Sequence, residues 1–169
     1  MLDVTPIPME QSSLRWRLTD PKYRVAPPAH LAQIEPLDAA SAGRLLEVTV
    51  PWYREQPFTR GFFAEVTSTP LAGDDGAADG RRVRKWLYQR GVPFKRRVFL
   101  SWDSTEAAVT TWKMFVKYWD ELWYPGSDDL AVFDESLSWA LFLWHEGEAF
   151  FARRPGAGGY DRRAAATDL

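Results

Sequence analysis

The strongest periodicity in the chain lies between residues 103 and 124, where large apolar side chains recur every three or four positions. Such spacing places them on one face of an amphipathic helix. They are Val109, Trp112, Phe115, Val116, Trp119 and Leu122. Asp103 and Glu106 stand three residues apart, which is the spacing of a capping box. The pattern therefore predicts one helix from 103 to 124, ended by Pro125 and Gly126.

Two other segments carry the end signals of helices. In 36–48, Asp38 is a good N-cap for a short helix whose leucines come at its far end. In 80–91, Asp79 is a suitable N-cap, and Gly91 stands where a helix commonly ends in the left-handed conformation. We therefore predict helices in both segments.

Alternation of apolar and polar residues predicts strands at 46–53, 60–69 and 96–102. Three apolar segments separated by short turns follow, at 130–134, 139–145 and 149–153, and these predict an antiparallel meander. The middle segment is apolar on both faces, which is typical of a central strand. The predicted fold class is α+β, with a mostly antiparallel sheet packed against two or three helices.

Length and composition favour one globular unit, since the chain has 169 residues, of which 46% are hydrophobic and 15% aromatic. We predict a single α+β domain over 1–154, whose first 35 residues are extended and punctuated by proline. Residues 155–169 are small, glycine-rich and charged, so a disordered tail is predicted there.

Composition also restricts the chemistry. The chain has no cysteine, which excludes disulfides and thiolate sites. The first 18 residues lack the apolar core of a secretion signal, and no apolar run approaches the roughly 18 residues of a membrane span. A cytoplasmic protein without membrane contact is therefore expected.

His145 and Glu146 are the residues that most suggest catalysis. Alternation at a strand end points neighbouring side chains to opposite faces, which is a poor geometry for joint work on one substrate. A zinc-protease helix would need a second histidine four residues away, and this chain lacks it. We predict no catalytic residue, metal or cofactor. The alternative is a small metal-dependent hydrolase built around His145 with Glu146 and Glu148.

Charge is strongly segregated along the chain. Residues 81–97 contain eight basic side chains and no acidic one, whereas residues 118–152 contain eight acidic side chains and no Lys or Arg. One interpretation is that the two blocks neutralise each other in the fold. A second is that the basic block follows a nucleic-acid backbone. The residues proposed for that alternative are Arg81, Arg82, Arg84 and Lys85.

A third interpretation is that the acidic turns form a surface for a basic protein, because complementary charge accelerates association. Trp123 and Tyr124 stand beside these turns, and tryptophan and tyrosine are frequent interface anchors. A tryptophan-rich surface would also suit a homodimer, and that possibility is left open.

The segment Lys113 to Arg153, about a quarter of the chain, resembles part of a group of small bacterial α+β proteins. The similarity rests on an aromatic element, WDELWYPGSDD, followed by a W…HE…FF strand pair. Some of these proteins look like immunity proteins, which bind and block a toxin. The resemblance implies a non-enzymatic cytoplasmic protein whose partner is another protein, and the acidic turns would suit a basic toxin such as a nuclease. The contacts to test would then be Asp128, Asp129, Glu146 and Glu148.

Overall fold

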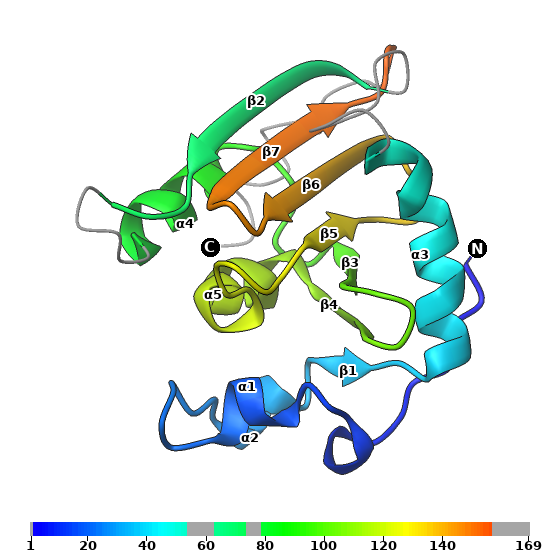
Figure 1. Ribbon diagram of the computed structural model, residues 1–169, viewed down its shortest axis with the longest axis vertical. Helices are drawn as coiled ribbons and strands as arrows, with labels where there is room; N and C mark the ends of the chain where they lie inside the picture. The colour runs from blue at the N-terminus through cyan, green and yellow to red at the C-terminus, as the bar shows by residue number, and fades with distance from the viewer. Residues whose placement is uncertain (1, 54–62, 74–78, 157–169) are drawn as a thin grey trace.

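The computed structural model describes residues 2–53, 63–73 and 79–156, and its centre is one seven-stranded sheet in the order β1-β4-β3-β5-β6-β7-β2 (Figure 1). Every pair of neighbouring strands is antiparallel. The predicted meander is confirmed as β5 (Leu130–Phe133), β6 (Trp139–Trp144) and β7 (Glu148–Arg153). The α+β class is confirmed with it.

The remaining strands extend the sheet on both sides of the meander. β3 (Arg97–Ser101) joins β5, and β4 (Ala107–Thr111) follows it as a hairpin partner. The edges are β1 (Glu35–Pro36), which pairs with β4, and β2 (Ala64–Pro70), which pairs with β7. β1 and β2, which flank α3 in the sequence, thus lie at opposite edges of the sheet.

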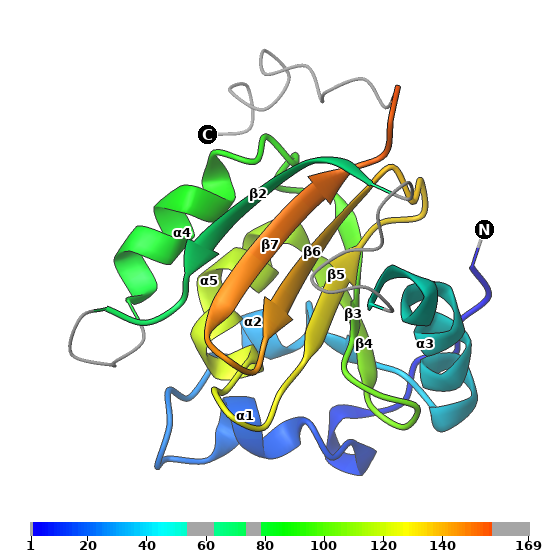
Figure 2. The ribbon, with the colours of Figure 1, turned by 45° about the horizontal axis from the view of Figure 1, so that its top comes forward.

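Helices cover the sheet on both faces, as Figures 1 and 2 show. α4 (Gly80–Tyr88) and α5 (Trp112–Leu122) lie on one face, and α3 (Ala39–Tyr53) lies on the other. Strand alternation divides the core accordingly, because Val98 and Leu100 of β3 belong to the α5 side whereas Phe99 belongs to the α3 side. This double cover explains why β6 is buried along almost its whole length.

α4 begins and ends as its sequence signals predict. The Asp79 side chain accepts a hydrogen bond from the Arg82 backbone N–H over 3.2 Å. Gly91 follows the helix with a φ of +74°, a left-handed conformation that glycine adopts without strain.

The single helix predicted for 103–124 is wrong in its first half. Residues 107–111 form β4, and α5 begins only at Trp112 with Thr111 as its N-cap. Asp103 does accept the Glu106 backbone N–H, over 2.8 Å, but it does so in the turn between β3 and β4. A carboxylate that caps a turn has the same local spacing as one that caps a helix.

The strand predicted at 46–53 is also wrong, because α3 continues from Ala39 to Tyr53. Its buried positions include Ala42, Leu45 and Trp52, whose spacing fits one helical face against the sheet. Burial of this face outweighs the strand preference of the β-branched residues near its end.

The segment 1–35, predicted as extended, contains three short helical turns: η1 (Met9–Gln11), α1 (Arg15–Thr19) and α2 (Pro28–Leu31). Leu14 and Leu18 are buried in the same core cluster as the apolar side of α5. The tail predicted as disordered lies outside the described residues from 157 onward. No helix in the described part of the chain is long and apolar enough to cross a membrane.

Candidate functional site

Three aromatic rings from two distant segments meet at the surface beside α1. Trp16 stacks on Tyr124 with centroids 5.6 Å apart, and Tyr23 contacts both rings, at 5.3 Å from Trp16 and 5.7 Å from Tyr124. Trp16 is 42% exposed, among the largest exposed apolar side chains of the described residues. We call Trp16, Tyr23 and Tyr124 the aromatic cluster.

A buried ion pair holds the aromatic cluster in place. Arg17 donates to both carboxylate oxygens of Asp128, over 2.6 and 3.1 Å, and the two side chains are only 6% and 10% exposed. The guanidinium carbon lies 4.9 Å from the centroid of Trp16, 5.4 Å from that of Tyr124 and 5.7 Å from that of Trp102. Arg17 is therefore already the cation that these rings surround, and Trp16 leaves part of its surface open to solvent.

Asp128 also organises the turn that follows α5. Its carboxylate accepts the Tyr124 backbone N–H over 2.9 Å, and its carbonyl oxygen accepts the Trp123 indole N–H over 2.8 Å. The predicted roles of Asp128 and Trp123 as accessible partner contacts are wrong, because both residues are buried. A carboxylate and an indole satisfied inside the protein cannot also serve an external partner.

Tyr124, which belongs to the aromatic cluster, is only partly buried. Its hydroxyl donates to Glu121 over 2.9 Å. Burial, reinforced by this hydrogen bond and by the charge of Glu121, raises the pKa of Tyr124 far above its usual range. The phenol therefore stays neutral and keeps donating.

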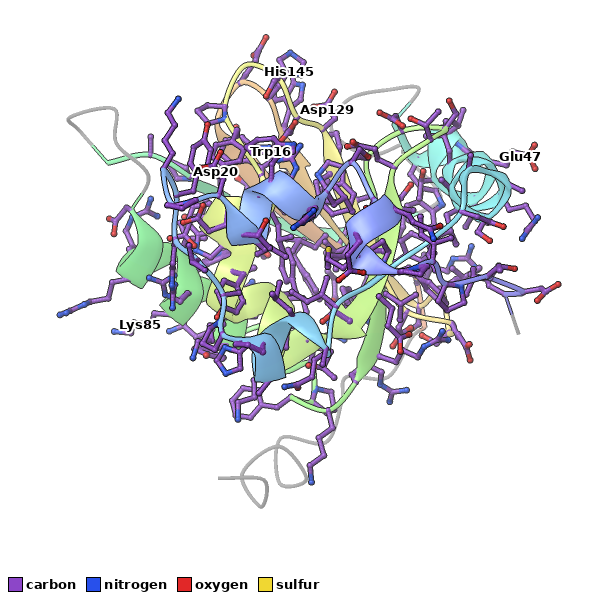
Figure 3. The ribbon with its side chains drawn as sticks, turned by 90° about the horizontal axis from the view of Figure 1, so that it is seen from below. Trp16, Asp20, Glu47, Lys85, Asp129 and His145 are labelled. Atoms are coloured by element: carbon purple, nitrogen blue, oxygen red, sulfur yellow. The ribbon has the colours of Figure 1, made fainter. Side chains whose placement is uncertain are left out.

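Two of the other predicted acidic residues, Asp129 and Glu146, border the aromatic cluster, because the turn after Tyr124 bonds to the turn after β6: the Gly126 N–H donates to the His145 carbonyl over 2.9 Å. Asp129 is exposed, and its carboxylate accepts a hydrogen bond from the His145 backbone N–H over 3.0 Å. The same oxygen lies 2.9 Å from Nδ1 of the His145 ring. Glu146 is exposed in the following turn, and Glu148 is half-buried as the first residue of β7. Figure 3 shows His145 and Asp129 side by side, with Trp16 and Asp20 on the same side of the molecule.

The two histidines have separate partners. His145 pairs with Asp129, whereas Nδ1 of His30 lies 2.6 Å from the Tyr118 hydroxyl. Among residues 2–53, 63–73 and 79–156, no three His, Cys, Asp or Glu side chains are grouped so as to hold a metal ion. The hydrolase alternative thus has no set of metal donors in the described part of the chain.

Opposite charges from the two sequence blocks meet in pairs. Arg84 lies 3.3 Å from Asp120, Arg96 3.6 Å from Asp134, and Arg97 3.3 Å from Glu135. Arg82 has partners next to α4: it pairs with Asp79 and donates to the Thr69 hydroxyl and the Pro70 carbonyl. Much of the basic block is therefore neutralised by the fold, while Arg81 and Lys85 stay exposed.

Sequence reasoning missed Trp16, Arg17 and Tyr23. The only local signal was the alternation of arginine and tryptophan in RWR, inside a segment interpreted as extended. What joins these residues to Tyr124 is the ion pair between Arg17 and Asp128, which are 111 positions apart. No local pattern encodes such a contact.

Comparison with known proteins adds no relative from which a role can be transferred. No family model matches the chain, and neither curated proteins nor solved structures match it. The resemblance of 113–153 to immunity proteins therefore stays a prediction. The aromatic cluster and its charged border are the features on which a function can be argued.

Proposed function

We propose that this protein is a non-enzymatic, cytoplasmic protein-binding module whose contact surface is the aromatic cluster with its acidic border. The proposal rests on an exposed tryptophan that packs against two tyrosines. Tryptophan and tyrosine dominate binding hot spots because they bury much area at little entropic cost. A cluster already held by Arg17 and Asp128 loses little further freedom on binding.

The charges around the cluster indicate what kind of partner it takes. Asp129 and Glu146 stand exposed on one side, next to the turn that carries Tyr124. Carboxylates at the rim of an interface chiefly accelerate the encounter with a basic partner. This arrangement suits a basic protein, and the proposal extends to an immunity-type protein that neutralises a basic toxin.

The test is affinity capture from a nuclease-treated lysate of the protein's own cells, read by quantitative mass spectrometry. Three tagged proteins are compared: the wild type, the variant Trp16→Ala with Asp129→Lys, and the control Glu47→Lys. Glu47 is exposed on α3, far from Trp16 in Figure 3. The proposal expects a basic protein that is retained by the wild type and the control and lost from the double variant.

Recovery of the same proteins in equal amounts by all three baits would refute a role for this surface. A captured protein that is then purified allows a direct rate measurement. Asp129→Lys is expected to slow association several-fold at low salt, with an effect that shrinks as salt screens the charges.

A further inference from the structure

Two arginines from distant segments converge on one carbonyl oxygen of α5. Arg24 Nη1 donates to the Lys117 carbonyl over 3.2 Å, and Arg84 Nη1 donates to the same oxygen over 3.5 Å. The next residue, Tyr118, has non-helical angles (φ −117°, ψ 16°) inside the helix. A kink of this kind opens backbone carbonyls to side-chain donors.

This convergence brings like charges close together. The two donor nitrogens are at most about 7 Å apart, since both bond to one oxygen. Arg84 has a carboxylate partner, Asp120, at 3.3 Å. In the described part of the chain the Arg24 guanidinium has no carboxylate partner and stacks instead on Tyr118, 4.9 Å from the ring centroid. An anion placed here would relieve the repulsion between the two guanidinium groups.

α4 extends the positive surface with two further cations. Arg81 and Lys85 are exposed, one helical turn apart, and neither is paired with a carboxylate within the described residues. With Arg84, Tyr88 and Gln89 they line a surface hollow of about 580 Å³. The whole of α4 contains four basic residues and no acidic one. We call Arg24, Arg81, Arg84 and Lys85 the cation surface.

An aromatic ring lies on the same hollow. Tyr88 is 44% exposed, and its ring is held edge to face against Phe94 with centroids 5.3 Å apart. An exposed ring beside a row of cations is the arrangement by which proteins bind single-stranded nucleic acid: cations contact the phosphates and the ring stacks on a base. Arginine and lysine are the usual phosphate-binding side chains.

We propose that the cation surface binds a short single-stranded nucleic acid through its phosphates, with Tyr88 stacking on a base. Arg82, Arg96 and Arg97 are held by Asp79, Asp134 and Glu135. Arg84 also pairs with a carboxylate, Asp120, but it is included because it lines the hollow beside Arg81 and Lys85. Arg24 joins them from outside the basic block. The cation surface adjoins the aromatic cluster where Arg24 follows Tyr23 in the chain, but the nucleic-acid proposal does not depend on the protein-binding proposal.

The probe is a fluorescein-labelled single-stranded oligonucleotide, titrated by fluorescence anisotropy at several salt concentrations. If the four cations each contact a phosphate, the logarithm of the affinity falls with a slope of about −3 against the logarithm of salt. That slope corresponds to a loss of about sixty-fold between 50 and 200 mM salt. Arg81→Glu with Lys85→Glu is expected to abolish binding, and Arg24→Gln to reduce both the affinity and the slope.

Arg44→Glu is the matched control, because Arg44 is an exposed arginine on α3, one turn before Glu47. Figure 3 shows Glu47 and Lys85 on opposite sides of the molecule. Binding that is unchanged in Arg44→Glu and lost in the α4 double variant supports the proposal, provided that circular dichroism shows both variants folded. Equal binding by the α4 variant and the wild type, or no binding at 50 mM salt, overturns it.

Tyr88→Ala and inorganic triphosphate separate nucleic acid from a simple anion. We expect Tyr88→Ala to lower the affinity for the oligonucleotide by at least about five-fold, equivalent to roughly 1 kcal/mol for one stacked base. Triphosphate should compete only at far higher concentration. Competition by triphosphate at matched phosphate concentration, together with no effect of Tyr88→Ala, would overturn nucleic-acid binding in favour of a general anion site.

Discussion

Replacing Asp128 by alanine should destabilise this protein far more than the same change at its neighbour Asp129. The substitution leaves Arg17 charged, 6% exposed and without its carboxylate, and it removes the acceptor of the Tyr124 backbone N–H. Breaking a buried ion pair from one side costs about 3–5 kcal/mol, because the remaining charge stays desolvated. For a protein of this length, each kcal/mol lowers Tm by roughly 2–4 °C. We therefore expect Tm to fall by about 6–20 °C.

The adjacent residue is a matched control. Asp129 also forms an ion pair, with His145, but both side chains are more than 40% exposed, so Asp129→Ala should cost no more than about 1 kcal/mol. The assay is urea unfolding at pH 7, followed by tryptophan fluorescence. Losses for Asp128→Ala and Asp129→Ala that agree within about 0.5 kcal/mol would refute the distinction between a buried structural carboxylate and an exposed one.

Three further predictions concern other parts of the fold. Trp52→Ala should cost about 3–5 kcal/mol in urea unfolding, because the ring is 1% exposed and packs edge to face on Phe133; a loss below about 1 kcal/mol would contradict the role of α3 as the cover of its sheet face. A double-mutant cycle of His30→Ala and Tyr118→Phe should give a coupling of about 0.5–1.5 kcal/mol from their hydrogen bond, and additivity would exclude that bond. For Asp103, burial raises the pKa, but hydrogen bonds from Thr105 and from the Glu106 backbone N–H outweigh it, so the folded-state pKa lies below the usual value. The stabilisation by the ionised carboxylate is therefore present above about pH 4 and lost as pH falls further. Asp103→Asn should unfold more easily than the wild type at pH 7 and nearly as the wild type does at pH 2. A loss of stability that is the same at pH 7 and pH 2 would show that the ionised carboxylate is not the cause.

The sequence predicted those elements whose local pattern and tertiary environment agree. β5, β6 and β7 alternate or are continuously apolar, and short turns join them, so periodicity alone identified the meander. It failed at 107–111 because Ala-Ala-Val-Thr-Thr fits a helical series as well as a strand. Pairing with both β1 and β3 decides the strand, and this information is not local.

The sequence predicted only those residues of the candidate site whose exposure follows from their local position. Asp129, Glu146 and Tyr124 lie near the surface as expected, since turn residues are usually solvated. Asp128 is the exception: it looks identical to Asp129 in sequence, yet it is buried because Arg17 comes to it from the N-terminal segment. Neighbouring residues in the chain cannot reveal a partner 111 positions away.

The strand order also constrains how the chain folds while it is being synthesised. β1 and β2 are made before the other strands, but the strands they pair with, β4 and β7, follow much later in the chain. Neither early strand can complete its ladder on the ribosome until those later strands emerge. We therefore expect the meander and the β3–β4 hairpin, whose contacts are local, to form first. Until then the first third of the chain exposes apolar side chains destined for the core, which is the stage at which chaperones would protect it.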